Sequence, residues 1–337
     1  MKRATLKTVA LQLGLSVTTV SRALKNGPEV RPETIARVKQ VATELGYMPH
    51  QGGLFLRTGR THIISLILSP EPQSAFPAMG FMYYCQGIIR ALKDSAYTLS
   101  IQPRLAHEDL LKPIQRIVEG RLADGVIIGQ TRDQDLRVKY LLENEFPFVT
   151  FGRTELFTPH AYYDVLHERI TYESVKRFQQ QGHQRIALIN PPTLLNYTGH
   201  RLKGYHQALR EAGTPQDESL ILNTELSFET GRQALQQFRQ LSNPPTAILS
   251  PGVSTTLGLL AEMRECGMRL PQDLDLIAFE GTNHLEFNNP RINAYHSSLE
   301  HAGEQLCRLL LRRLEGDPPE ALQVLHTPEF RHRAESG

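Results

Sequence analysis

The sequence predicts an N-terminal all-α helix-turn-helix headpiece followed by an α/β body of two lobes, each a parallel sheet flanked by helices. Three observations lead to this fold class. Residues 1–48 carry helical apolar patterns on both sides of a glycine. Residues 61–337 alternate short apolar runs with longer amphipathic segments. The strands expected early in this body recur later at a nearly constant offset in sequence. Residues 49–60, between the headpiece and the body, are expected to be a linker.

The headpiece is expected to contain three short helices. An apolar stripe over residues 9–13 is interrupted by Gly14, and Ser16 is well placed to cap a second helix. Two short helices around a glycine-containing turn form a helix-turn-helix. Pro32 is expected to open the third helix. The apolar residues of that helix, which close the small core, are Ile35, Val38, Val41, Ala42 and Leu45.

The second helix has an inner and an outer face. Val20 and Leu24 are four residues apart and are expected to face the first helix. Thr18 and Arg22, also four apart, then lie on the opposite side with Val17 beside them. Arg22 offers two donors to a guanine edge, Thr18 a hydroxyl, and Val17 an apolar surface that suits a thymine methyl group. The pattern therefore predicts a helix that reads a major groove.

Charge is strongly polarised along the chain. Residues 1–60 hold 10 Lys or Arg against 3 Asp or Glu, a net charge of +7, and the remaining residues hold 27 against 32, a net charge of −5. A basic end joined to an acidic body is expected when one end alone meets phosphates. The alternative is a small three-helix domain whose surface Lys and Arg bind no nucleic acid.

The body is expected to contain two similar sets of strands. Each strand of the second set begins 122–127 residues after its counterpart in the first. This spacing favours two α/β lobes with a ligand cleft between the carboxyl ends of their strands, although a single large doubly wound sheet is an alternative. The expected strands begin near Ile63, Thr98, Gly125 and Phe148 in the first set and near Ile186, Leu220, Ala247 and Asp275 in the second.

The chain resembles the lactose and purine repressor (LacI/GalR) family of bacterial transcription regulators over its whole length. The resemblance is carried by TLKTVALQLGLSVTTVSRAL, ELGYMPH, GHQRIALI, RLKGYHQAL and PPTAIL. It implies a DNA-binding regulator, expected to be a repressor, that binds a pseudo-palindromic operator as a homodimer. It also implies a body like the sugar-binding proteins of the periplasm. Lobe 1 is expected over roughly 61–160 and 291–320, and lobe 2 over roughly 161–290 and 321–337.

The resemblance also assigns the DNA-binding residues. Val17, Thr18 and Arg22 are expected to read bases, whereas a larger group is expected near the sugar-phosphate backbone, where it sets register and salt-sensitive affinity. The members of this group are Thr5, Ser16, Thr19, Ser21, Arg31, Tyr47 and His50.

The linker both matches the family and departs from it. Leu56 occupies the place of the leucine that enters the minor groove from the family's hinge helix. Gly52 and Gly53 replace better helix formers, and each Gly disfavours helix by about 1 kcal/mol relative to Ala. We therefore expect residues 50–57 to be disordered off DNA, and Gly53→Ala to tighten operator binding. The alternative is a linker that is only a flexible tether.

A small-molecule effector is expected between the lobes. Arg201, in HRLKGY, matches the arginine with which the family contacts its effectors, and Tyr197 offers a ring for the apolar face of a sugar. Ordinary packing is at least as good an explanation for the loop aromatics, and a helix-start arginine bonded to a loop is the alternative for Arg201. The full set of expected effector residues is Phe76, Gln130, Arg153, Tyr197, Arg201, Gly252 and Glu280.

Two of these positions depart from the family pattern. Gly252 and Val253 stand where the family usually has Asn and Asp, and Glu280 stands where it usually has Asp. These changes remove polar partners for sugar hydroxyls. The effector is expected to be a carbohydrate or glycoside, and an anionic sugar acid held by Arg153 and Arg201 together is the competing hypothesis.

Other function classes find less support in the sequence. No phosphate-binding or nucleophile motif and no chelating histidine pair is present, so no enzyme, metal or cofactor is expected. No secretion signal or apolar run of membrane-spanning length is present, so the protein is expected in the cytoplasm and away from membranes. The three cysteines share no ligand or redox spacing. A cytoplasmic sugar-binding module without direct gene control is the alternative function.

Overall fold

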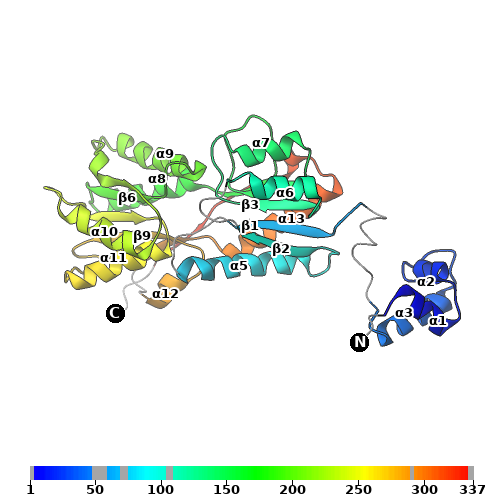
Figure 1. Ribbon diagram of the computed structural model, residues 1–337. Helices are drawn as coiled ribbons and strands as arrows, with labels where there is room; N and C mark the ends of the chain where they lie inside the picture. The colour runs from blue at the N-terminus through cyan, green and yellow to red at the C-terminus, as the bar shows by residue number, and fades with distance from the viewer. Residues whose placement is uncertain (1–3, 48–58, 69–74, 104–108, 289–291, 333–337) are drawn as a thin grey trace. The chain divides into compact units, whose positions relative to one another are not determined.

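A computed structural model describes residues 4–47, 59–68, 75–103, 109–288 and 292–332. The chain divides into two compact units, Met1–Thr61 and His62–Gly337. Figure 1 shows the helical first unit and the α/β second unit. The expectations about His50, Leu56 and the two linker glycines lie outside the described residues.

The first unit is the predicted helix-turn-helix with its third helix. The helices are α1 (Leu6–Leu13), α2 (Val17–Ala23) and α3 (Pro32–Glu44). Gly14 ends α1 with φ of +65°, a left-handed conformation that glycine adopts without strain. Ser16 caps α2 and Pro32 opens α3, as predicted. Val9, Val20 and Val38, one from each helix, are fully buried where the helices meet.

The second unit contains two six-stranded sheets, so the single-sheet alternative is wrong. The first sheet has the strand order β11-β5-β4-β3-β1-β2, and all of its strands are parallel. Its strands are β1 (Ile63–Leu68), β2 (Thr98–Pro103), β3 (Gly125–Ile128), β4 (Phe148–Phe151), β5 (Tyr162–Val165) and β11 (Gln323–His326).

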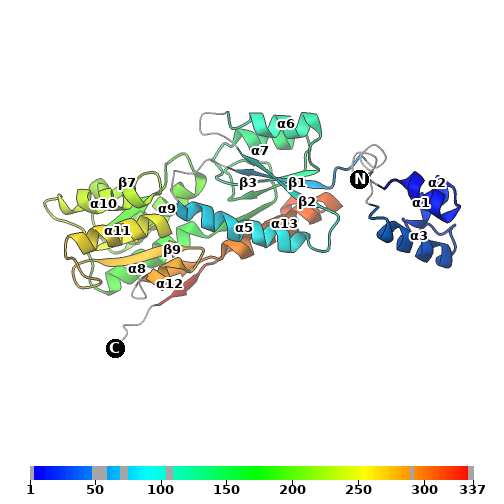
Figure 2. The same ribbon diagram turned by 60° about the horizontal axis from the view of Figure 1, so that its bottom comes forward.

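Helices cover both faces of the first sheet. On one face, α5 (Ala75–Leu92) and α13 (Leu299–Glu315) share a core with Ile64, Ile127 and Val149. On the other face, α6 (Lys112–Gly120) and α7 (Leu136–Glu143) pack over β1, β3 and β4. Figure 2 shows this sandwich with α6 and α7 above the sheet and α5 and α13 below it. A short helix, η2 (Pro319–Leu322), precedes β11.

The second sheet has the order β12-β10-β9-β8-β6-β7, in which only β12 is antiparallel to its neighbour. Its strands are β6 (Ile186–Asn190), β7 (Ile221–Asn223), β8 (Ala247–Ser250), β9 (Asp275–Glu280), β10 (Asn293–His296) and β12 (Glu329–Arg331). Two helices cover each face: α8 (His167–Gln180) and α9 (Asn196–Glu211) on one, and α10 (Phe228–Arg239) and α11 (Val253–Glu265) on the other. The short helices are η1 (Glu218–Leu220) and α12 (His284–Asn288).

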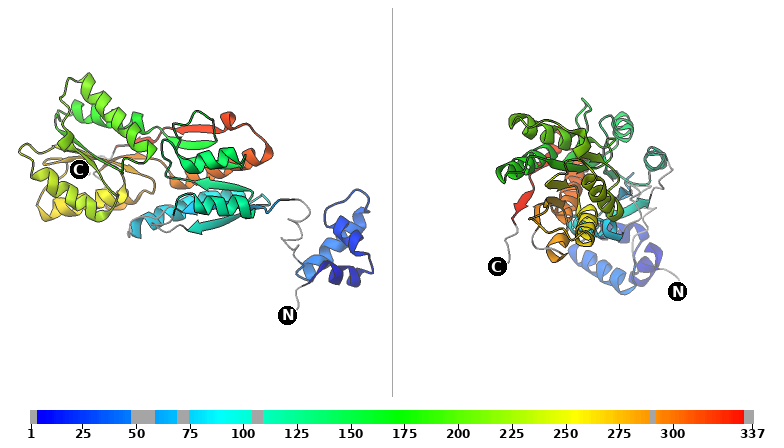
Figure 3. Two further views of the ribbon diagram at one scale, coloured as in Figure 1. Left: turned by 45° about the horizontal axis from the view of Figure 1, so that its top comes forward. Right: turned by 90° about the vertical axis from the view of Figure 1, so that its left-hand side faces the viewer.

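All eight predicted strands are present, but the expected lobe boundaries need correction at three further strands. β5 and β11 belong to the first sheet, where the boundaries placed them in lobe 2, and β10 belongs to the second sheet, where they placed it in lobe 1. Each of these strands pairs with a neighbouring strand of the lobe that the chain is about to leave. The chain therefore crosses to the other lobe after Val165, His296 and His326. Figure 3 (left) shows the connecting segments that run between the lobes.

No helix in the described part of the chain is both long and apolar enough to span a bilayer. The three cysteines are free thiols, and Cys85 and Cys307 are buried in the core of lobe 1. Burial raises the pKa of the Cys307 thiol to about 12, and this keeps it in the unreactive protonated form.

Candidate functional site

The outer face of α2 is the first candidate site. Thr18 and Arg22 are exposed on this face, and Val17 beside them is 40% exposed. Val20 and Ala23 of the same helix are buried against the other two helices. The three side chains expected to read bases are therefore open to solvent on one helix. A helix presented in this way fits the major groove of B-DNA.

Hydroxyl groups near this face cap the helices. The Ser16 hydroxyl accepts the backbone N–H of Thr19 at 3.0 Å, and the Thr5 hydroxyl accepts that of Thr8 at 3.3 Å. Both residues thus fix a helix start in the free protein, in addition to any contact that they make with phosphate. The other described residues expected near the DNA backbone reach the headpiece surface wholly or in part: Thr19, Ser21, Arg31 and Tyr47.

Glu29 is a neighbour of Arg22 that the sequence analysis missed. The Arg22 Nε lies 3.2 Å from the Glu29 Oε1, and both side chains are about half exposed. The loop between α2 and α3 brings them together, since the Gly27 N–H donates to the Arg22 carbonyl at 2.9 Å. The carboxylate holds one edge of the guanidinium, which leaves the Nη groups for a base edge.

The second candidate site is a cavity of about 460 Å³ between the two lobes of the body. Several residues that line it come directly after strands of both sheets: Gly129 after β3, Pro191 after β6, Pro251 after β8 and Gly281 after β9. The carboxyl ends of parallel strands therefore meet at this cavity, as predicted for the ligand cleft.

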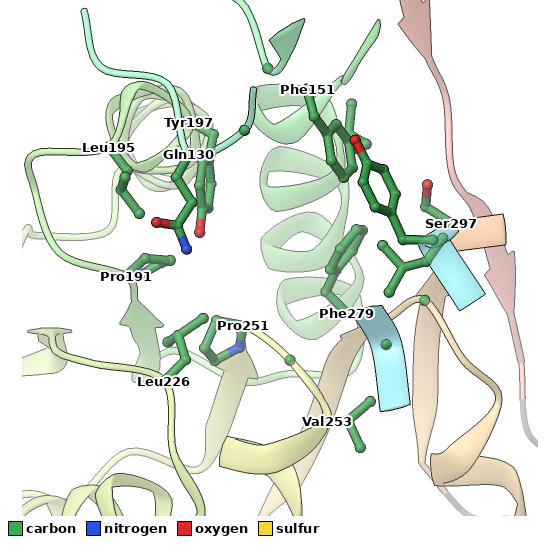
Figure 4. A pocket seen from close by; sticks show the side chains of 18 of the residues that line it. Gln130, Phe151, Pro191, Leu195, Tyr197, Leu226, Pro251, Val253, Phe279 and Ser297 are labelled. Carbon is green, nitrogen blue, oxygen red and sulfur yellow. The ribbon is translucent and has the colours of Figure 1, made fainter. Parts of the chain in front are cut away.

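Most of the expected effector residues line this cavity. Five of the seven do so: Gln130, Tyr197, Arg201, Gly252 and Glu280. Figure 4 shows Gln130 and Tyr197 on one wall and Phe151 and Phe279 on the facing wall. Phe76 lies on α5, but its side chain lies outside the described residues. Arg153 is not among the lining residues, because its side chain is held by Asp164 and His200.

Arg201 is the most unusual group in the cavity. Its side chain is 2% exposed, and burial lowers the pKa of its guanidinium to about 10. Its Nε has no hydrogen-bond partner among the described residues. A buried charge without a partner is costly, and a ligand that offers oxygen acceptors removes that cost.

Asp164 adds a carboxylate that the sequence analysis missed. It lies at the end of β5, lines the cavity and is 2% exposed. Its Oδ2 is 3.5 Å from the Arg153 Nε. Burial raises the pKa of Asp164, and the Arg153 charge opposes this shift. Arg153 thus partly offsets the charge of Asp164, whose Oδ2, like the Nε of Arg201, has no hydrogen-bond partner among the described residues.

The two positions that depart from the family pattern contribute to the cavity in different ways. Glu280 is buried at the cavity wall, but its Oε2 also accepts the backbone N–H of Leu285 at 3.2 Å, so it holds the start of α12. Gly252 and Val253 give the cavity a peptide and an apolar side chain at the start of α11. Thr255 of the same helix has a buried hydroxyl without a partner among the described residues.

Aromatic side chains supply much of the remaining surface of the cavity. Tyr197 stacks on His167 with 4.8 Å between ring centroids, and Phe151 stacks on Tyr84 at 5.8 Å. Burial, together with the nearby Arg201 charge, holds the pKa of His167 well below its usual value, so this ring is neutral. Aromatic faces beside a few directed polar groups are typical of a small-molecule site. Among the described residues, no group of three His, Cys, Asp or Glu side chains is arranged to hold a metal ion.

Both parts of the chain are similar to parts of known bacterial proteins. Residues 5–50 match the family model "Bacterial regulatory proteins, lacI family", and residues 175–334 match the model "Periplasmic binding protein-like domain". The HTH-type transcriptional regulator AglR of Rhizobium meliloti (strain 1021) is 32% identical, over 98% of this chain and 94% of the relative. The HTH-type transcriptional repressor CytR of Escherichia coli (strain K12) is 29% identical, over 93% of this chain and 90% of the relative.

A solved structure extends this likeness to the whole fold. The complex of the transcriptional regulator CelR with cellobiose superimposes with a TM-score of 0.73 at 26% identity, over 99% of this chain and all of that one. The fold and the two sites thus define a DNA-binding transcriptional regulator with a periplasmic-binding-protein-like body. The chain belongs to the LacI family of bacterial regulatory proteins.

Proposed function

We propose that this regulator is a cytoplasmic repressor that binds a pseudo-palindromic operator as a homodimer, and that a neutral carbohydrate or glycoside in the cavity controls its operator affinity. The observation that carries the proposal is the buried guanidinium of Arg201, whose Nε has no hydrogen-bond partner among the described residues, in a ring-lined cavity of a chain that also has a basic helix-turn-helix. The binding of cellobiose by CelR and the repressor activity named for CytR support it.

Charge in the cavity favours a neutral sugar over a sugar acid. The competing hypothesis needs Arg153 and Arg201 to hold one anion together. Arg153 instead pairs with Asp164 and does not line the cavity, whereas Asp164 and Glu280 do. An anionic ligand would therefore lack the second guanidinium that this hypothesis requires, and it would meet the Glu280 carboxylate, which disfavours it.

Exposed apolar side chains support the homodimer. Met82 and Ile89, seven residues apart on α5, are each 58% exposed, and Ile101 on the edge strand β2 is 42% exposed. Met82 and Ile89 lie on one face of α5, because seven residues make about two helical turns, and exposed apolar side chains on one face favour burial against a second copy. A dimer is also what the recognition helix needs, because one such helix reads only a half-site.

A thermal-shift screen of sugars, glycosides and sugar acids tests the effector proposal. A ligand at about 100 times its dissociation constant stabilises the native state by about 2.7 kcal/mol. We expect hits among neutral carbohydrates, and each hit should change the affinity of the protein for genomic operator fragments in a fluorescence-anisotropy titration. Stabilisation by sugar acids alone would contradict the neutral-ligand proposal, and hits without any effect on DNA binding would favour the sugar-binding module.

A further inference from the structure

The first turn of α9 joins the two lobes through Asn196. Its backbone N–H donates to the carbonyl of Thr131 at 2.9 Å. Its side-chain Nδ2 donates to the Asp133 Oδ1 at 2.9 Å and to the Glu155 Oε1 at 3.1 Å. Asn196 belongs to lobe 2 and its three partners to lobe 1. One residue that is only 3% exposed therefore bonds two carboxylates and a carbonyl across the boundary between the lobes.

The partners in lobe 1 are held in place without Asn196. They lie in two loops, one after β3 and one after β4. The Glu155 N–H donates to the Asp133 carbonyl at 3.0 Å, and the Gln134 Nε2 donates to the Glu155 carbonyl at 3.3 Å. The two loops thus present a preorganised pair of carboxylates, and little conformational freedom is lost when Asn196 binds them.

Both amide protons of Asn196 face charged acceptors. Its Oδ1 lies 3.0 Å from the Nε2 of His200, one turn further along α9, which leaves Nδ2 and its two protons for Asp133 and Glu155. Hydrogen bonds to ionised groups are about twice as strong as those between neutral groups. The two side-chain bonds across the lobe boundary are therefore stronger than contacts between neutral amides.

The contact at Thr131 lies next to the effector cavity. Gln130, which precedes it, lines the cavity and has φ of +52°, a left-handed conformation that is strained for a residue other than glycine. The buried Arg137 holds this turn, since its Nη2 donates to the Gln130 carbonyl at 3.0 Å. On the other side of the lobe boundary, Tyr197 and Arg201 of α9 line the cavity. The contact therefore joins the two walls of the cavity close to residues that line it.

We propose that Asn196 is a positioning residue that holds the two lobes together in the free protein, so that the closed arrangement of the cavity predominates before a ligand binds. Its bonds need neither sugar nor DNA, so this inference is independent of the proposed function. One consequence rests on that function. An effector should bind more weakly where the contacts of Asn196 are lost, because part of its binding energy must then close the lobes.

Interlobe distances measured by double electron–electron resonance test the role of Asn196 without sugar or DNA. Spin labels are attached at Glu143→Cys on α7 and Arg210→Cys on α9, both exposed, and the half-buried Cys266 is changed to Ser. Labelled chains are diluted with unlabelled protein, so that only distances within one chain are measured. We expect one short distance with Asn196 in place, and a longer distance whose population is about tenfold larger in Asn196→Asp.

Asn196→Asp keeps the shape of the side chain but places a third carboxylate against Asp133 and Glu155. It should not weaken α9 itself, because a negative charge is favourable in the first turn of a helix. A rescue variant adds Asp133→Asn and Glu155→Gln, whose amides can donate to the carboxylate on α9, and the short distance should return. Asn223→Asp, at an exposed position on β7 of the same lobe, is the matched control and should keep the short distance.

Asn196→Ala removes the side-chain bonds without adding a charge, and we expect it to increase the longer population less than Asn196→Asp does. A protein that shows mainly the longer distance with Asn196 in place, or an Asn196→Asp variant that keeps the short distance, would overturn the proposal. A longer distance that persists in the rescue variant would contradict it too, since the opening would then not come from these contacts. If the distances behave as expected but no sugar binds, the inference stands and the proposed function alone is wrong.

Discussion

Arg201 carries a buried charge that forms no ion pair with the described residues, and its Nε has no hydrogen-bond partner among them. Replacement of a buried ion pair by apolar side chains of similar volume is often neutral or stabilising by about 1–4 kcal/mol, and a buried charge without an ion-pair partner bears the desolvation cost without the Coulombic gain. We therefore expect Arg201→Leu to unfold at a higher temperature than the wild type without ligand and to lose the thermal shift produced by any sugar hit. Arg185→Leu, at a partly exposed arginine paired with Asp217 outside the cavity, is the control and should keep the shift. A destabilised Arg201→Leu protein that still responds to sugar would show that Arg201 has a packing role instead.

Glu29 sits where a negative charge should oppose DNA phosphates, yet it pairs with Arg22. We expect Glu29→Gln to raise the affinity for non-specific DNA, because one charge that repels phosphates is removed. We also expect it to reduce discrimination at the base read by Arg22, because the guanidinium loses the carboxylate that orients it. Loss of a good base contact costs about 1–3 kcal/mol of discrimination. Anisotropy titrations with an operator fragment and with a scrambled one at the same salt concentration measure both effects. Unchanged discrimination would mean that the ion pair gives way when DNA binds.

The sequence placed Gln130 and Tyr197 at the cavity because each follows a strand that apolar runs locate, and it placed Arg201 there also through the family resemblance of HRLKGY. Asp164 was missed since β5 is a four-residue strand, YYDV, without the strand-helix alternation that reveals its neighbours. Arg153 was placed in the cavity by its position after β4, but its direction depends on Asp164 and His200, which are distant in sequence. Contacts between side chains that are distant in sequence produce no local sequence pattern, so the direction of Arg153 could not be predicted.

At the scale of elements, apolar runs were enough to predict eight strands and the three headpiece helices. The strands that were not predicted are those at which the chain changes lobe. β10, β11 and β12 are short and follow one another with only one long helix among them, so neither spacing nor repetition distinguishes them. Their sheet membership is decided by pairing with β9, β5 and β10, which the sequence does not encode locally.

Helix crossings in lobe 1 depend on glycine. A Cβ added at Gly303 of α13 would lie 2.1 Å from the Tyr84 carbonyl of α5, so an alanine there forces the two helices apart. We expect Gly303→Ala to lower the free energy of unfolding by about 1–3 kcal/mol, the usual cost of overpacking. Gly199→Ala on α9 is the matched control, since its Cβ would meet nothing within 4 Å. Alanine should leave that helix equally stable or stabilise it by up to about 1 kcal/mol. Urea unfolding of the two variants measures both values, and equal stabilities would show that the α5–α13 crossing adapts.

At the scale of the whole molecule, the two units have separate cores. Among the described residues, the headpiece core is made of residues from α1 to α3 and of Leu15, Leu24, Val30, Leu45 and Tyr47 near them, whereas every residue that lines the cavity lies within His62–Gly337. DNA affinity and ligand affinity should therefore be separable in a truncated protein, even though the proposed function links them in the full chain.

We expect a protein of residues 62–337 to fold, to keep the thermal shift of the full chain with the same sugar, and to lose DNA binding at all salt concentrations. The full chain should bind DNA with an affinity that falls steeply with salt, because the net charge of +7 on residues 1–60 acts by release of counterions from phosphates. The body carries a net charge of −5 and offers no such attraction. Parallel melting and anisotropy experiments on the two proteins make the comparison. If the truncated protein bound DNA, the charge polarity of the chain would not be what directs it to the operator, and the body would have to contain a second DNA-binding surface.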